Sequence, residues 1–392
     1  MTARFLPPQR TRPPGSGMVP LLGTAGFISL VSTRLCDAML PALAQDFGTS
    51  TVEAATVISA YAVAYGLMQL VYGPLGDRYG KLRVIALACA ACTLATVAAA
   101  LAPSLTALVI ARAAMGGTAA AIFPLGLAWI SDSVPVAQRQ QVLARYSGLT
   151  VFGMVLGPLL GGLMAQAWSC RGAFVVVAAL FGGIGCLVWR QIGNESSGAA
   201  RPAGEARPLY ANPWSRIILG AACIEAALGI GCLALVPTFL HQRFGLSLTA
   251  AGVVVATFGL GGFLFSRCAA TLLRLVPRPT LPALGGAILA VAFGLLAVMP
   301  HWGWAALACV LAGFGFFTLH NTLQLQATQL APQATGLALG VFTVFIFIGQ
   351  SVGVSVVAVA YDRVGAGWVF AATAAGFLAL GTGMTALLKR RA

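Results

Sequence analysis

The chain is a series of apolar runs, each about as long as the roughly 20 residues that an α-helix needs to cross a bilayer. Short polar or Pro/Gly-rich breaks separate about twelve such runs. They begin near Val19, Ala54, Leu82, Leu105, Gln141, Arg171, Ser215, Leu248, Leu281, Trp302, Thr335 and Gly367. Only 8% of the residues are charged, against roughly 25% in a soluble protein. We therefore predict an all-α polytopic membrane protein.

One long polar connection divides the chain nearly in half. Residues 194–214 are rich in Gly, Ser, Pro and charged residues, which is typical of a flexible linker. We expect a tail over 1–18, a six-helix bundle over 19–193, a second bundle over 215–388 and a short tail over 389–392. The first residues contain Arg and Pro but no signal-peptide cleavage site, and Met18 is an alternative start.

The Lys and Arg residues gather on one side of the predicted membrane. The other side receives only Arg171, Arg243 and Arg363. Because cytoplasmic loops carry the excess of cations, we predict that both termini are cytoplasmic. The short loops favour a bacterial inner (plasma) membrane. The net charge of +14 therefore reflects topology rather than binding to nucleic acid, and we expect a monomer in the lipid bilayer.

The two halves of the chain carry a repeated glycine pattern. Gly153-x-x-x-Gly157 and Gly349-x-x-x-Gly353 lie 196 residues apart, which is half of the 392-residue chain. Transporters built from internal repeats hold their substrate at the interface between the repeats, near the midplane of the bilayer. We therefore predict two pseudo-symmetric bundles with a binding site between them.

The break between the second and third runs has an unusual composition. Its glycines permit a tight turn with positive φ, and its charges require a membrane surface. The stretch resembles the G-x-L-x-D-R-x-G-R-K loop of major facilitator superfamily transporters. The matching residues are Gly73, Leu75, Asp77, Arg78, Gly80 and Lys81, and together with Gly76 they form what we call the gating loop.

The resemblance implies a role for this loop in gating. In the family the loop carboxylate bonds to the second bundle and closes the cytoplasmic side of the outward-facing state. It follows that Asp77 and Arg78 form this contact, with Asp132 and Arg139 assisting from the break after the fourth run. The alternative is that Asp77 is a solvated turn charge.

The fifth run contains a second recognisable pattern, Gly153-x-x-x-Gly157-Pro158-x-x-Gly161-Gly162. Glycines four residues apart let another helix approach closely, and a proline removes one helical hydrogen bond. The string resembles the fifth-helix motif of the superfamily's antiporters, and an ordinary packing face is the alternative. The resemblance covers the whole chain and is closest to the twelve-helix drug:proton antiporters.

That resemblance implies the fold and the function. We expect the major facilitator fold and a proton-coupled antiporter that exports small amphipathic molecules or drugs by alternating access. No cofactor and no metal are expected, because the proton gradient drives transport. A proton-coupled uptake symporter for a sugar or organic acid is the alternative. An enzyme is not expected, since the chain has no HExxH or phosphate-loop motif.

Three ionisable residues lie inside the first and fourth runs. Each costs several kcal/mol of free energy in hydrocarbon, so each is expected to have a function. Arg34 and Asp37 are three residues apart and share a helix face. At about 1.5 Å per residue, Asp37 and Arg112 lie at similar depths, about 13 Å and 12 Å from the same membrane surface. We therefore expect them to meet.

Arg112 also begins an R-x-x-x-G string that ends at Gly116 and resembles a fourth-helix motif of the family. In the family this arginine faces the cavity and is implicated in proton transfer. Nearby cations favour an ionised Asp37, whereas an apolar site favours the protonated form. Our hypothesis is that Asp37 carries the proton. The alternative is a static structural cluster of Arg34, Asp37 and Arg112.

The remaining polar residues inside the runs are candidates for the cavity. Glu225 in the seventh run either attracts cationic substrates, carries a second proton, or makes a helix–helix hydrogen bond. In the tenth run, Asn321 and Gln324 share a face, with His320 at its edge. They either line the cavity or bond between helices. Tyr61, Tyr65 and Gln69 form a stripe in the second run that we expect to face the cavity.

Overall fold

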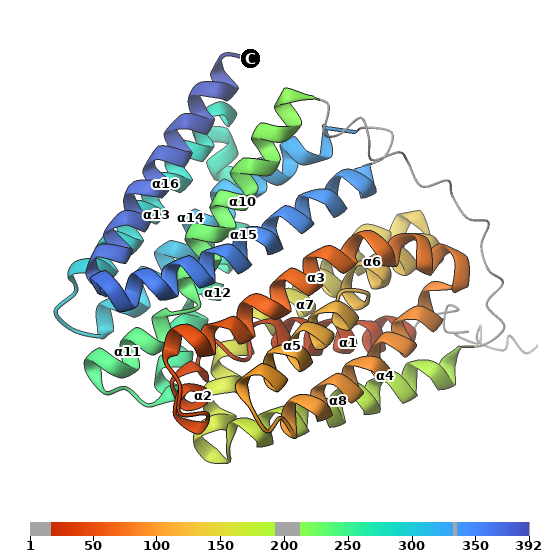
Figure 1. Cartoon of the computed structure of the whole chain (residues 1–392). Coiled ribbons are helices and arrows are strands. Elements are labelled where there is room, and N and C mark those ends of the chain that lie inside the picture. Colours follow the sequence, from red (N-terminus) through yellow and green to blue (C-terminus); the bar gives the residue numbers. More distant parts are fainter. Residues whose placement is uncertain (1–16, 193–211, 332–334, 392) are drawn as a thin grey trace, which may run out of the picture.

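The computed structural model describes residues 17–192, 212–331 and 335–391, and over these residues the chain is helical throughout and contains no strand (Figure 1). The predicted all-α fold is confirmed. Most of the expected linker and of the N-terminal tail lie outside the described residues, as does Ala392 at the end of the C-terminal tail.

The N-terminal half packs α1 to α8 into one bundle. Its elements are α1 (Met18–Arg34), α2 (Leu40–Asp46), α3 (Thr51–Tyr79), α4 (Lys81–Ala100), α5 (Leu105–Ala119), α6 (Ile122–Ser133), α7 (Val136–Ala167) and α8 (Cys170–Gln191). The C-terminal half contains α10 (Pro213–Leu233), α11 (Val236–Phe244), α12 (Leu248–Leu275), η1 (Arg278–Thr280), α13 (Leu281–Val298), α14 (Gly303–Thr328), α15 (Thr335–Val364) and α16 (Ala366–Lys389).

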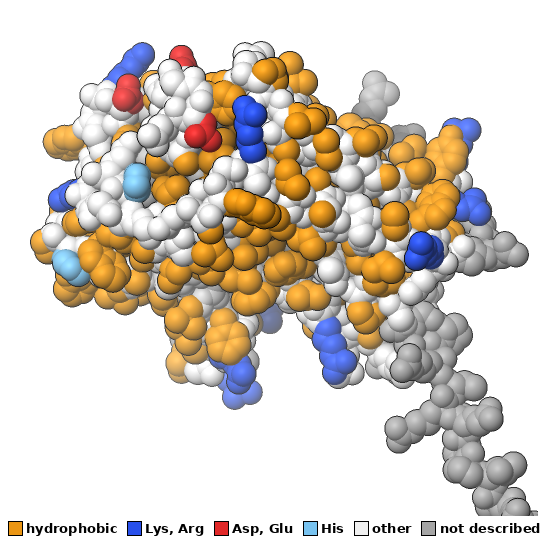
Figure 2. All heavy atoms as spheres, turned by 90° about the horizontal axis from the view of Figure 1, so that it is seen from below, with side chains coloured by type: hydrophobic (Ala, Val, Ile, Leu, Met, Phe, Trp, Pro, Cys, Tyr) orange, Lys and Arg blue, Asp and Glu red, His pale blue; other side chains and the backbone are white. Residues whose placement is uncertain are grey.

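Within the described residues, 11 helical segments are long and apolar enough to cross a membrane. The helix α1 is apolar but shorter, and with α2 it forms the first of the predicted runs. Figure 2 shows hydrophobic side chains over most of one face, with the Lys and Arg side chains mostly near its margins. An apolar belt with cations at its edges is what a bilayer requires of a protein surface.

Three of the predicted runs are not continuous helices, and the fourth of all the runs breaks between α5 and α6, at Ala120 and Ala121. The first breaks between α1 and α2, so that Asp37 lies in a turn, and the seventh breaks between α10 and α11. Pro41 and Pro237 each occupy the second position of the helix that follows the break, where a proline ring is tolerated but cannot continue the preceding helix. These two prolines lie 196 residues apart, in step with the glycine repeat.

The gating loop differs from the predicted tight turn. Helix α3 continues to Tyr79, so Gly73 and Gly76 are helical, and of the loop's glycines only Gly80 has a positive φ, of 91°. Gly76 instead lets Leu125 of α6 pack against α3. The turn is therefore a single glycine between α3 and α4, and the preceding charges extend from the last turn of a helix.

The repeated glycines perform the same packing in both halves. On α7, a Cβ at Gly153 would collide with the carbonyl of Phe27 in α1. On α15, a Cβ at Gly349 would collide with the carbonyl of Cys223 in α10. Phe27 and Cys223 are themselves 196 residues apart. Each half therefore packs its fifth helix against its first through bare glycine backbone, as predicted for two pseudo-symmetric bundles.

The two halves meet along an interface that we call the seam, formed by α3 with α15 and α7 with α12. Ser59 Oγ donates to the carbonyl of Ser351 and Ser351 Oγ donates to that of Ser59, at 3.1 and 3.0 Å. On the other pair, Gly162 abuts Leu248. These contacts lie toward the start of α3 and of α12, far from their basic ends.

We call the end of the molecule that carries Arg78, Arg139, Arg274 and Lys389 the basic end. Figure 1 shows the two bundles converging near α2 and α11 and diverging toward the basic end. Every ion pair among the described residues lies within one half. The seam is thus closed at one end of the molecule, and no described ion pair closes it at the other.

Candidate functional site

A charged cluster occupies the break in the first run. The Nε of Arg34 lies 2.6 Å from Oδ2 of Asp37, and both side chains are almost completely buried. The other carboxylate oxygen, Oδ1, has no hydrogen-bond partner among the described residues. Burying an ion pair is costly unless its remaining polar atoms are satisfied. A buried acceptor without a partner is suited to receiving a proton.

Arg34 also reaches across the seam. Its Nη1 lies 3.5 Å from the carbonyl oxygen of Ile230 in α10, to which it donates. Arg34 and Ile230 are 196 residues apart and occupy equivalent positions in the two halves. The side chain that pairs with Asp37 therefore contacts the other bundle directly.

Arg112 approaches the same cluster from α5. Its Nη1 donates to the carbonyl of Ser32 at 3.1 Å, and its guanidinium carbon lies 4.2 Å from the centre of the Tyr61 ring. The side chain is fully buried. Arg112 thus meets the first run, as its depth predicted, but it binds a backbone carbonyl of α1 rather than the carboxylate of Asp37.

The spacing of Arg112 and Gly116 has a structural reason. A Cβ at Gly116 would collide with the carbonyl of Tyr61, so α5 and α3 can approach only because this position is glycine. That approach places the Tyr61 ring under the guanidinium of Arg112 one turn earlier. The stack stabilises a buried cation without neutralising its charge.

The glycines of α7 position the cluster from the other side. Gly157 abuts the Cβ of Arg34, and a Cβ at Gly161 would collide with the carbonyl of Leu35. The neighbouring Gly162 faces α12 instead. Helix α7, which runs through Pro158, therefore supports the break in α1–α2 with one face and joins the seam with another.

The aromatic stripe of α3 is buried in helix packing. Tyr61 and Tyr65 are at most 1% exposed, and the Tyr65 ring lies 4.3 Å from that of Phe347 in α15, across the seam. Gln69 is partly exposed. None of the three lines the large cavity described below. Their predicted place in a cavity wall between the bundles stays a prediction, and in this structure the rings of Tyr61 and Tyr65 pack α3 against α5 and α15.

The C-terminal half contains a second buried pair, which the sequence did not predict as a pair. The Nδ1 of His320 in α14 lies 2.9 Å from Oε2 of Glu225 in α10. Glu225 is fully buried, and its Oε1 has no hydrogen-bond partner among the described residues. The pair could have been proposed from the sequence, because ionisable residues inside a membrane pair with one another. Glu225 and His320 are the two residues of this kind that stood out in the C-terminal runs.

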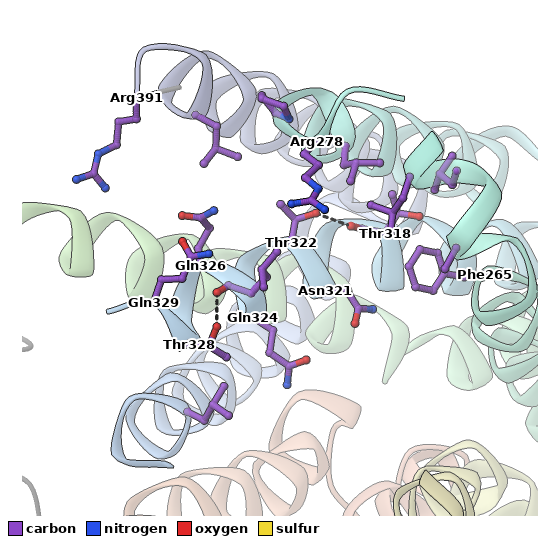
Figure 3. A pocket seen from close by; sticks show the side chains of 18 of the residues that line it. Phe265, Arg278, Thr318, Asn321, Thr322, Gln324, Gln326, Thr328, Gln329 and Arg391 are labelled. Atoms are coloured by element: carbon purple, nitrogen blue, oxygen red, sulfur yellow. Dashed lines mark hydrogen bonds between the residues drawn. The ribbon is translucent and has the colours of Figure 1, made fainter. Parts of the chain in front are cut away.

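A cavity of about 1080 Å³ opens in the C-terminal half near the basic end (Figure 3). Asn321 and Gln324 line it, whereas His320 is turned away toward Glu225. In Figure 3 Arg278 lies beside Thr318 and Thr322 on one side of α14. Asn321 and Gln324 extend from another side of the same helix.

The gating residues form one network within the N-terminal half. The Nζ of Lys81 lies 2.9 Å from a carboxylate oxygen of Asp77 and 2.9 Å from one of Asp132. Arg78 lies over the ring of Tyr79, and Arg139 donates to the carbonyl of Val134. Within the part of the chain that the structure describes, Asp77 thus pairs with Lys81 and not with Arg78 or with the other bundle.

Comparison with known proteins identifies the family of the chain. The profile of the Major Facilitator Superfamily matches residues 22–354 of the chain. The chain belongs to this superfamily of transporters. A major facilitator structure, that of a bacterial homolog of the human lysosomal transporter Spinster in an inward-facing and occupied conformation, superposes with a TM-score of 0.77. It covers 97% of this chain and 98% of that one at 17% identity, and it confirms the predicted fold.

Two curated members of the superfamily illustrate its nearer relatives. The fatty acid resistance protein FarB of Neisseria gonorrhoeae is 30% identical over 155 residues, or 40% of this chain and 31% of FarB. The multidrug export protein EmrB of Haemophilus influenzae is 23% identical over 210 residues, or 54% of this chain and 40% of EmrB. The match thus spans less than half the length of either relative.

Proposed function

We propose that the chain is a secondary transporter that exchanges protons for small amphipathic molecules and exports those molecules from the cytoplasm. Membership of the superfamily supports a transporter, and relatives named for multidrug export and fatty acid resistance support export. The glycine face of α7, which resembles the antiporter motif, packs directly against the charged cluster.

One observation carries the proposal: Arg34 contacts both Asp37 and the carbonyl of Ile230 in the opposite half. While Asp37 is ionised, the ion pair holds the guanidinium in place, and the guanidinium holds the two halves together. A proton on Asp37 removes the charge that fixes Arg34. The protonation state of one carboxylate is thereby linked to the strength of the seam.

This link provides what an exchanger requires. A carrier that is empty of both proton and substrate must not change conformation, since that step would uncouple the two flows. The ionised Asp37–Arg34 pair holds the empty carrier in the conformation whose seam is closed at the end opposite the basic end. Either a proton on Asp37 or a bound substrate releases the carrier from it, because each changes the relative stability of the two states.

The state of the molecule follows from the expected topology. With the basic end in the cytoplasm, a seam closed at the opposite end corresponds to an inward-facing carrier that has released its proton. The network of Lys81 with Asp77 and Asp132 then lies at the open side, unattached to the second bundle.

Transport in inside-out vesicles tests the proposal. Cells that overexpress the protein are first screened for resistance to acidic, neutral and basic antimicrobials, with and without a proton uncoupler. A compound found in this screen is then followed in vesicles whose lumen is acidified. An exporter accumulates it in the lumen until the uncoupler is added, whereas accumulation driven by a gradient of the opposite sign indicates the uptake symporter.

Two matched variants make the vesicle experiment specific. Asp37→Asn is expected to abolish uncoupler-sensitive accumulation at wild-type protein levels. Asp46→Asn, which changes an exposed carboxylate at the end of α2, is expected to leave it unchanged. Full activity in Asp37→Asn would refute Asp37 as the proton carrier.

A further inference from the structure

The charged residues around the large cavity are all of one sign. Among the described residues, two charged side chains line it, Arg278 from η1 and Arg391 just past the end of α16, and no carboxylate does. Residues 212–391 contain only two carboxylates, Glu225 and Asp362. Neither is available to the cavity: Glu225 is buried against His320, and Asp362 lies in α15 near the opposite end.

The rest of the lining is divided between apolar and polar walls. Phe265 and Leu272 of α12 belong to the apolar part. Asn321, Gln324 and Gln326 of α14 supply uncharged hydrogen-bonding groups. Both arginines are themselves exposed, so they attract an anion that approaches from solvent. The cavity is therefore complementary to a molecule with an apolar body and a negatively charged group.

The two arginines reach the cavity from different elements. The guanidinium carbon of Arg391 lies 4.3 Å from the centre of the Trp214 ring at the start of α10. In Figure 3, Arg278 and Arg391 approach α14 from separate elements and lie toward different ends of its polar face. Guanidinium groups bind carboxylate and phosphate through paired hydrogen bonds. Both arginines retain donors for an incoming acid, because the described residues offer them no carboxylate.

We propose that this cavity is the entry site for substrate and that it selects amphipathic acids, whose acid group is bound by Arg278 or by Arg391. The proposal rests on the export function given above and adds the chemical class of the substrate. It also places the recognition of substrate in the C-terminal half, apart from the Asp37 cluster in the N-terminal half. Cationic compounds are disfavoured at this site, since the one buried carboxylate of this half already has a partner.

Binding in phosphatidylcholine nanodiscs, without any proton gradient, tests this inference. The probes are 11-dansylaminoundecanoic acid, its methyl ester and the corresponding primary amine, detected by energy transfer from tryptophan. We expect the acid to bind at least about tenfold more tightly than the amine or the ester, the size expected for a charge-assisted hydrogen bond. Equal binding of acid and amine would overturn the proposal.

Substitutions locate the site. The double variant Arg278→Gln/Arg391→Gln is expected to lose the preference for the acid, and Arg278→Lys/Arg391→Lys to retain part of it. Arg274→Gln removes an exposed arginine of α12 that does not line the cavity, and it should bind the acid as the wild type does. An equal loss in Arg274→Gln would show that the general positive charge of this surface, not the cavity, attracts the probe.

Two further outcomes separate the competing explanations. If nanodiscs containing phosphatidylglycerol abolish binding of the acid, the arginines bind lipid headgroups and the substrate assignment fails. If the chain exports a cationic dye in an uncoupler-sensitive manner but does not bind the acid, this inference fails while the proposed export function stands. Binding of the acid without any export would instead overturn the export function.

Discussion

At the residue scale, the two buried carboxylates have partners of different kinds. Asp37 is paired with Arg34 three residues away, and the short spacing predicted that the two side chains lie on one face, although Asp37 lies in the turn after α1. Glu225 is paired with His320, 95 residues away. Their pairing depends on how α10 and α14 are rotated against each other, which one sequence does not specify. Sequence therefore identified all four residues but only one of the two pairs.

We expect Glu225 and His320 to contribute to the stability of the folded protein only when both are present. His320→Ala leaves a buried carboxylate without its partner, a change that costs about 3–5 kcal/mol when the charge is fully desolvated. Glu225→Gln removes the charge and should cost less. The double variant should then be more stable than His320→Ala alone. Thermal unfolding of the purified variants in detergent measures this, and strictly additive effects would show that the two residues do not interact.

At the scale of elements, the glycine faces of α7 and α15 were recognised from sequence, and their repeat at 196 residues is reproduced by the packing against α1 and α10. The breaks after Arg34 and Leu233 were not predicted, although Pro41 and Pro237 mark them. A proline near the end of an apolar run fits a kinked continuous helix as well as a broken one. In the wall of the large cavity, the polar face of α14 was singled out from sequence, whereas Arg278 and Arg391 were missed.

Helix α7 offers a matched test of the glycine face. A Cβ at Gly161 would collide with the carbonyl of Leu35, whereas Gly148 on the same helix has open space around its Cβ position. Gly161→Ala is expected to lower stability by about 1–3 kcal/mol, the typical cost of overpacking. Gly148→Ala should be neutral or stabilising by up to about 1 kcal/mol, because alanine is the better helix former. Equal melting temperatures for the two variants would contradict the proposed close packing of α7 on α1.

At the scale of the whole molecule, the arrangement of the two bundles follows from their repeat, but the conformation does not. The runs and their repeat predicted a polytopic all-α protein in two halves, and the resemblance of the gating loop and of the fifth-run glycine string to motifs of the superfamily implied the major facilitator fold. Which end of the seam is closed depends on small differences in free energy between states. The structure shows Ser59 with Ser351 and Arg34 with Ile230 closing one end, and of these residues only Arg34 stood out in the sequence.

The central claim is that the protonation state of Asp37 sets the balance between the two conformations, and spin-label distances test it without a known substrate. Labels at exposed positions Gln141 of α7 and Arg274 of α12, with the exposed Cys186 and Cys268 replaced, report the separation of the halves at the basic end. The wild type is expected to show the long distance at alkaline pH and to gain a shorter one on acidification. Asp37→Asn should show both distances at every pH, and Glu225→Gln should behave as the wild type does. A pH-dependent shift that persists in Asp37→Asn would contradict the account.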